Sequence, residues 1–139
     1  MKRIVSAWVV YENTILFVLH KKHSLWLPPG GHVEHGETIY DAVHRELQEE
    51  TGLAIELVDY SPRSFKTDRD ALPLPFNIML SKKIHFEFLA TSSTKHVVLQ
   101  EEKLDEYMWL TKEEVQAHPD IIEPVKQKAL FALQYTHSC

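Results

Sequence analysis

The 139-residue chain has little cysteine, little glycine and no long hydrophobic run. Its one cysteine is Cys139, so no internal disulfide can form and a reducing compartment is expected. No apolar run is long enough to span a bilayer, and the apolar core of the N-terminal segment is too short for a convincing signal peptide. We therefore expect a cytoplasmic protein that has no membrane partner.

Excess positive charge is also absent, because the formal net charge is −5. This balance disfavours a nucleic-acid binder built on a basic surface, so nucleic acid is not an expected partner. A hydrophobic content of 44% and a charged content of 25% are typical of a globular protein. The chain contains no internal repeat, low-complexity segment or linker, which predicts a single domain over residues 1–139. Homodimer formation is left open.

An acidic cluster near the end of a predicted helix is the most informative feature. The helix is predicted over Thr38–Thr51, and at roughly 100° per residue Glu46, Glu49 and Glu50 share one of its faces. Like charges this close repel one another, so a cation is expected among them. Carboxylate oxygens suit Mg²⁺ or Mn²⁺. A solvated acidic face is the alternative, but the apolar stripe of the helix leads into the cluster and argues against it.

The residues around this cluster resemble the Nudix box, the motif of the Nudix hydrolases, with every specified position matched. The matching positions are Gly31, Glu37, Arg45, Glu46, Leu47, Glu49, Glu50, Gly52 and Leu53. The resemblance implies an α/β fold, namely an α/β/α sandwich with a mixed sheet. It also implies metal-dependent hydrolysis of a diphosphate bond in a nucleoside diphosphate linked to another moiety.

The resemblance further assigns roles to individual residues. Glu46 and Glu50 are expected to be direct metal ligands, with Glu49 as the next choice, and the Gly30 or Gly31 carbonyl could complete the coordination shell. Arg45 precedes Glu49 by one helical turn and is expected to orient its carboxylate rather than to bind phosphate. The predicted catalytic residues are thus the three glutamates and Arg45, and the predicted metal site is the three glutamates and Gly31.

The identity of the general base is left open. One of the box glutamates could serve, as could a carboxylate outside the box, for which Glu101, Glu102 and Glu106 are candidates. Ordinary surface charge is the alternative for those three residues. Glu37 is expected to brace the loop before the helix, and a contribution to metal binding through water is left open. The basic segment Lys21–His23 could attract an anionic substrate or be a plain basic turn.

The sequence indicates the type of reaction more clearly than it indicates the substrate. Subclasses of the family carry a marker residue downstream of the box, a proline in an ADP-ribose type and a tyrosine in a dinucleoside polyphosphate type. Thr67–Ala71 contains neither marker at the usual place, which favours a small MutT-like hydrolase of a nucleoside triphosphate or a related phosphorylated metabolite. The attached group is expected to be recognised near Ser61–Phe76. One alternative is a binding module that senses a nucleotide without cleaving it, which the intact glutamates disfavour. Another is a capped-RNA hydrolase, which the acidic net charge disfavours.

Strand and turn patterns predict the remaining elements. Strands are predicted over Ile4–Tyr11, Thr14–Leu19, Leu25–Leu27, Leu53–Tyr60, Phe76–Leu80, Ile84–Ala90 and Glu106–Leu110. Pro28–Gly31 should end the third of these strands, and Ser61–Pro75 should form a long loop. A short helix should begin after Thr111, and a C-terminal helix is predicted over Ile121–Tyr135 with Ile122 in its apolar stripe.

Overall fold

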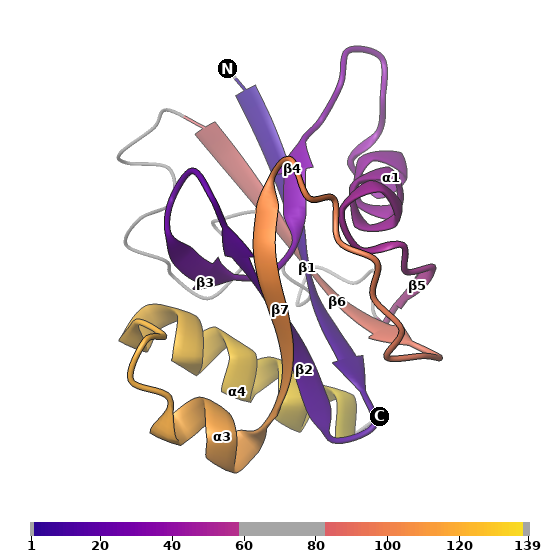
Figure 1. The fold of residues 1–139 in the computed structure, drawn as a ribbon. Coiled ribbons are helices and arrows are strands. Elements are labelled where there is room, and N and C mark those ends of the chain that lie inside the picture. The colour runs from indigo at the N-terminus through magenta and orange to yellow at the C-terminus, as the bar shows by residue number, and fades with distance from the viewer. Residues whose placement is uncertain (1, 59–82, 138–139) are drawn as a thin grey trace.

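A computed structural model describes residues 2–58 and 83–137 of the chain (Figure 1). The strands are β1 (Lys2–Tyr11), β2 (Thr14–His20), β3 (Leu25–Leu27), β4 (Gly30–His32), β5 (Ile55–Leu57), β6 (Lys83–Ser92) and β7 (Leu104–Thr111). The helices are α1 (Ile39–Thr51), α3 (Lys112–Ala117) and α4 (Glu123–His137). The strands form one sheet in the order β3-β2-β1-β6-β5, with β4 paired to β1 and β7 paired to β2. The β1–β6 pair is parallel and the other pairs are antiparallel, so the sheet is mixed.

Helices cover both faces of this sheet, with α1 on one side and α3 and α4 on the other (Figure 1). Successive residues of a strand point to opposite faces. Accordingly, β1 contributes Val5, Ala7 and Val9 to the core beneath α1, and Trp8 and Val10 to the core beneath α4. This arrangement confirms the predicted α/β/α sandwich with a mixed sheet.

Strands β1 and β2 diverge soon after their hairpin. They pair at Val10–Ile15 and at Tyr11–Thr14. Further from the hairpin, β1 pairs with β4 through Ile4–Ser6, whereas β2 pairs with β3 and β7. The sheet is therefore forked, and the gap between the two branches provides space for a pocket.

Helix α1 has the boundaries that its capping residues predict. The Thr38 hydroxyl accepts a hydrogen bond from the Asp41 N–H at 3.0 Å, which satisfies a donor of the first turn. Gly52 ends the helix at φ 72°, a left-handed conformation that glycine adopts without steric cost, and donates to the Gln48 carbonyl. No helix within residues 2–58 and 83–137 is long and apolar enough to cross a membrane.

Several element boundaries differ from the sequence prediction, among them the start of β5 at Ile55 instead of Leu53 and the start of β7 at Leu104 instead of Glu106. Pro28–Gly31 does end β3, but Gly30 already begins β4 because the backbone of β4 pairs with β1. Helix α4 begins at Glu123, and Ile122 is 37% exposed instead of lying in the apolar stripe. The loop and strand predicted between Ser61 and Leu80 lie outside the described residues.

Candidate active site

The C-terminal half of α1 buries two carboxylates. Glu46 is 5% exposed and Glu50 is 2% exposed, on the same helix face that buries Ala42 and Leu47. The apolar stripe therefore continues into acidic residues, as the sequence predicts. Glu49 differs from both, because its side chain is 48% exposed. The three glutamates thus do not share one environment: two are buried and one lies at the rim.

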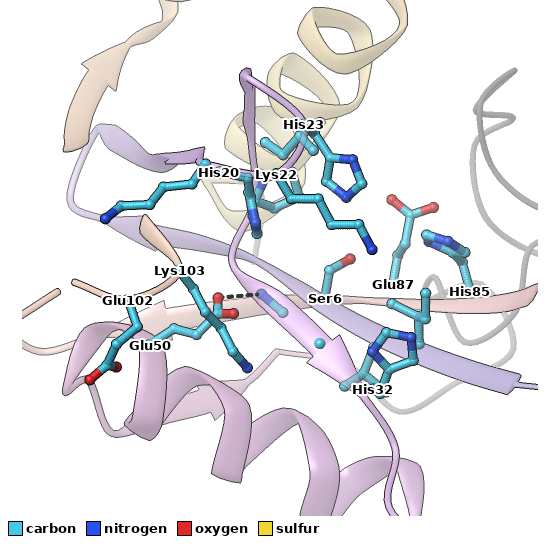
Figure 2. Close-up of a pocket in the computed structure, with 17 residues that line it drawn as sticks. Ser6, His20, Lys22, His23, His32, Glu50, His85, Glu87, Glu102 and Lys103 are labelled. Carbon is cyan, nitrogen blue, oxygen red and sulfur yellow. Dashed lines mark hydrogen bonds between the residues drawn. The ribbon is translucent and has the colours of Figure 1, made fainter. Parts of the chain in front are cut away.

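Strand β4 lies directly against the two buried carboxylates. The Gly30 N–H donates to Glu50 Oε1 at 3.1 Å (Figure 2). A Cβ at position 31 would overlap the carboxyl group of Glu46, so a side chain there would displace this carboxylate from its position beside β4. The structure therefore brings Gly31 next to Glu46, as a shared metal site requires, while coordination by the Gly31 carbonyl stays a prediction.

The environment of these carboxylates disfavours their charged forms. Burial, opposed by the hydrogen bond from Gly30, raises the pKa of Glu50 to about 7. Burial likewise raises the pKa of Glu46, against the influence of Arg45. In addition, Glu46 Oε2 is buried and has no hydrogen-bond partner. An unsatisfied buried oxygen is costly, and a divalent cation would satisfy it, so the residues present fit such an ion.

The protein supplies only part of a metal-ligand set. Among the described residues, no three or more histidine, cysteine, aspartate or glutamate side chains converge as a ready-made cation site. This pattern suits Mg²⁺, which usually keeps several waters and takes one or two carboxylates together with substrate phosphate oxygens. Glu46 and Glu50 are the two buried carboxylates that α1 offers for such a role.

Arg45 links the acidic residues of the site. Its Nε and Nη2 atoms donate to the two carboxylate oxygens of Glu37 at 2.7 and 3.0 Å. Its Nη1 atom donates to Glu49 at 2.6 Å, the pair expected from the sequence, and to Glu46 Oε1 at 3.0 Å. The hydrogen bonds from Arg45 lower the pKa of Glu37 to about 2. Glu37 also accepts from the Glu34 N–H at 2.9 Å and so braces the loop before α1.

A pocket of about 590 Å³ opens in the fork between β1 and β2 (Figure 2). Glu50 and strand β4 line one part of it, and Ser6 and Glu87 line another. Lys21–His23 also lines this pocket, so the basic segment lies at the site. Glu102 lines the pocket too, which distinguishes it from the other two candidate bases outside the box.

One buried ion pair beside this pocket was missed in the sequence. Glu87 on β6 and Lys128 on α4 are each 1% exposed and form a close ion pair. The Trp8 Nε1–H also donates to Glu87 Oε1 at 3.1 Å. The available signal was the position of Lys128, three residues after Val125 and four before Ala132, within a buried helical stripe. The predicted recognition segment Ser61–Phe76 lies outside the described residues.

Comparisons with protein families and with solved structures both match nearly the whole chain to Nudix proteins. A family model described as the NUDIX domain matches residues 1–132. A Nudix-family hydrolase from Clostridium perfringens has a similar structure, with a TM-score of 0.79 and 28% sequence identity. That likeness covers 96% of this chain and 97% of the other chain.

Similar curated proteins are hydrolases with different named substrates. The NAD-capped RNA hydrolase NUDT12 of Macaca fascicularis is 30% identical over 110 residues, which are 75% of this chain and 21% of that protein. The m7GpppN-mRNA hydrolase NUDT17 of Xenopus laevis is 58% identical over 38 residues, covering 27% of this chain and 13% of that protein. The nucleoside triphosphatase NudI of Klebsiella pneumoniae is 32% identical over 91 residues, covering 65% and 64%. The matches thus span about a fifth or less of the two capped-RNA hydrolases.

Proposed function

Because this chain belongs to the NUDIX domain family, we propose that it is a pyrophosphohydrolase that cleaves a diphosphate bond in a small nucleotide-like metabolite. A nucleoside triphosphate or a related phosphorylated metabolite is the leading substrate, and Mg²⁺ or Mn²⁺ is the required ion. The observation that carries this proposal is the buried Glu46 carboxylate with an unsatisfied oxygen, one helical turn from the buried Glu50. Buried acids without sufficient compensation are costly, so a ligand that supplies positive charge accounts for them.

Each box residue has a distinct role in this proposal. Glu46 and Glu50 hold the ion from the buried side, and the carbonyl of Gly31, whose Cα adjoins the Glu46 carboxyl group, adds a third donor in this proposal. Glu49 contributes from the exposed rim, where water and phosphate oxygens have room. When bound, a divalent cation neutralises charge on the diphosphate and makes water a better nucleophile. Arg45 is a positioning residue, because it orients the carboxylates of Glu46 and Glu49.

Proton transfer requires a carboxylate near the attacking water. The base accepts the proton of that water as its oxygen bonds to phosphorus, and the bridging oxygen leaves with the electrons of the broken P–O bond. A box glutamate could fill this role, and so could Glu102, which lines the same pocket. The location of Glu102 favours it over Glu101 and Glu106 among the carboxylates outside the box.

Capped RNA is a second candidate substrate, since NUDT12 and NUDT17 are named as hydrolases of capped RNA. The net charge of −5 disfavours a long RNA-tracking surface but has little bearing on recognition of the cap itself. The name of NudI, a nucleoside triphosphatase, supports the small-metabolite candidate. We further propose that residues 1–139 act as one domain in the cytoplasm.

Turnover of a substrate panel tests this function. The protein is incubated with Mg²⁺ and nucleoside triphosphates, nucleotide sugars, dinucleoside polyphosphates, and RNA bearing either an NAD or an m7GpppN cap. We expect cleavage at a diphosphate bond of a small nucleotide, and loss of that cleavage when EDTA removes the ion. Tight binding without turnover of any member would refute the hydrolase proposal and favour a nucleotide-sensing module. Selective turnover of capped RNA would replace the leading substrate.

A further inference from the structure

Two lysines of the pocket carry positive charge that the proposed metal chemistry does not use. Lys22 lies in the turn between β2 and β3, and Lys103 lies directly before β7. Figure 2 shows both side chains reaching into the pocket, and both residues line it. Within residues 2–58 and 83–137, neither lysine has an ion-pair partner, whereas the neighbouring Lys21 pairs with Asp105 at 3.8 Å.

Backbone hydrogen bonds hold these lysines in a fixed relation to the buried carboxylates. The Gln100 N–H donates to the Glu50 carbonyl, and the Lys103 N–H donates to the Gln100 carbonyl, each at 3.0 Å. The Lys21 N–H then donates to the Lys103 carbonyl, also at 3.0 Å. The end of α1 is thereby connected through Gln100 to Lys103, and then to the turn that carries Lys22. Both lysines therefore extend from backbone that is anchored to the candidate active site.

The charges in the pocket are unevenly distributed. The charge of Lys103 acts on both Glu46 and Glu50, where it opposes the larger effect of burial on their pKa values. Burial lowers the pKa of His20, so its imidazole is neutral at neutral pH and contributes no positive charge. Glu87 is already in a buried ion pair with Lys128, which compensates its charge. The positive charge of Lys103 thus acts on the box glutamates, whereas the Lys22 side chain extends toward Ser6 on another side of the pocket (Figure 2).

On the basis of the proposed function, we propose that Lys22 and Lys103 bind a phosphate group of the substrate that lies outside the metal-bound diphosphate. A cation held by Glu46 and Glu50 compensates their charge, which leaves the Lys103 ammonium available to the substrate. An ammonium group contacts phosphate as a point charge, and such charge-assisted contacts are strong in a pocket. The preferred substrate is therefore phosphate-terminated, such as a nucleoside triphosphate, rather than a nucleoside diphosphate joined to an uncharged sugar.

The test compares these two substrate classes in single variants. In the presence of Mg²⁺, kcat/KM is measured for a nucleoside triphosphate and for UDP-glucose. The proteins are the wild type, Lys22→Met, Lys103→Met and Lys112→Met, the last being an exposed lysine of α3 outside the pocket. Each pocket variant is expected to lower kcat/KM for the triphosphate by about tenfold or more, and for UDP-glucose by less than about threefold. Lys103→Arg should retain most of the triphosphate activity, and Lys112→Met should leave both values unchanged.

Binding provides a second measurement that does not depend on turnover. The dissociation constant of a triphosphate analogue with non-hydrolysable α–β and β–γ bridges is measured by calorimetry, and Lys103→Met should raise it about tenfold. Equal losses on both substrates, a wild-type preference for UDP-glucose, or an affinity for the analogue that does not depend on either lysine would each overturn the proposal. If the wild type cleaves neither substrate but binds the analogue in a lysine-dependent way, the hydrolase proposal fails while the phosphate assignment stands.

Discussion

Glu87 on β6 and the glutamates of α1 are similarly buried, but they differ in how the protein compensates their charge. Glu87 has Lys128 as its own counter-ion and also accepts a hydrogen bond from Trp8. Glu50, by contrast, has no ion pair among the described residues and accepts one hydrogen bond from a backbone N–H. Glu46 shares the single guanidinium of Arg45 with other carboxylates and keeps one oxygen unsatisfied.

On the proposed function, this difference separates a structural charge from a functional one. Removing one partner from a complete buried pair leaves an uncompensated charge, so substitution of Glu87 or Lys128 alone should destabilise the fold. An incompletely compensated carboxylate is instead a site that a ligand can complete. The same degree of burial therefore predicts opposite consequences at the two places: substitution should affect stability at β6 and activity at α1.

The largest effect is expected from Glu50→Gln. The amide retains the size of the side chain but cannot supply the charge that holds a divalent cation, so turnover should fall about a thousandfold. The melting temperature should be unchanged or higher, because a neutral amide relieves a buried charge. Steady-state kinetics and thermal unfolding measure the two effects, with Glu113→Gln on the exposed surface of α3 as the matched control. Activity within about threefold of the wild type would refute the metal assignment.

Lys128→Met should show the opposite behaviour. Methionine is close in length to lysine but leaves Glu87 buried without its counter-ion, so the free energy of unfolding should fall by about 3–5 kcal/mol. Urea denaturation measures this loss. The double variant with Glu87→Gln should recover much of it, since the amide oxygen can still accept from Trp8. A single-variant loss below about 1 kcal/mol would contradict the structural role of this pair.

The stability of the metal-free protein should fall as the pH rises. Glu50 has an ordinary pKa of 4.5 and a pKa of about 7 in the folded protein, so between these values the folded state binds more protons than the unfolded state. The loss in unfolding free energy amounts to at most about 3 kcal/mol. Mg²⁺ should consequently raise the melting temperature more at about pH 8 than at about pH 6. Melting curves across this range test the trend, and Glu50→Gln should remove most of the slope.

A smaller effect is expected from Arg45→Lys. Lysine keeps the positive charge but cannot contact Glu37 with two donors while also reaching Glu46 and Glu49. Residues that orient metal ligands typically change metal affinity by about 10–100-fold when altered, so the Mg²⁺ concentration for half-maximal activity should rise by that amount. An unchanged Mg²⁺ dependence would show that Arg45 does not position the carboxylates.

Local patterns were sufficient to predict α1 and its buried carboxylates. The helix begins after Thr38 and ends before Gly52 because both capping interactions involve residues a few positions apart. The inward position of Glu46 and Glu50 follows from the same helical periodicity that buries the apolar stripe. Glu49 was grouped with them, but its position at the rim depends on how α1 packs against the rest of the protein.

Helix and strand periodicity thus identified the acidic cluster and the mixture of strands and helices, because these signals act between near neighbours in the chain, whereas the resemblance to the Nudix box implied the sandwich fold. The contact of Gly31 with Glu46, the forked sheet and the ion pair of Glu87 with Lys128 all join segments that are distant in sequence. No local pattern specifies such contacts, since they result from strand pairing and helix packing. The immediate sequence therefore identified the groups that can hold a cation, whereas long-range packing determined which buried acid is compensated and which lysines surround the site.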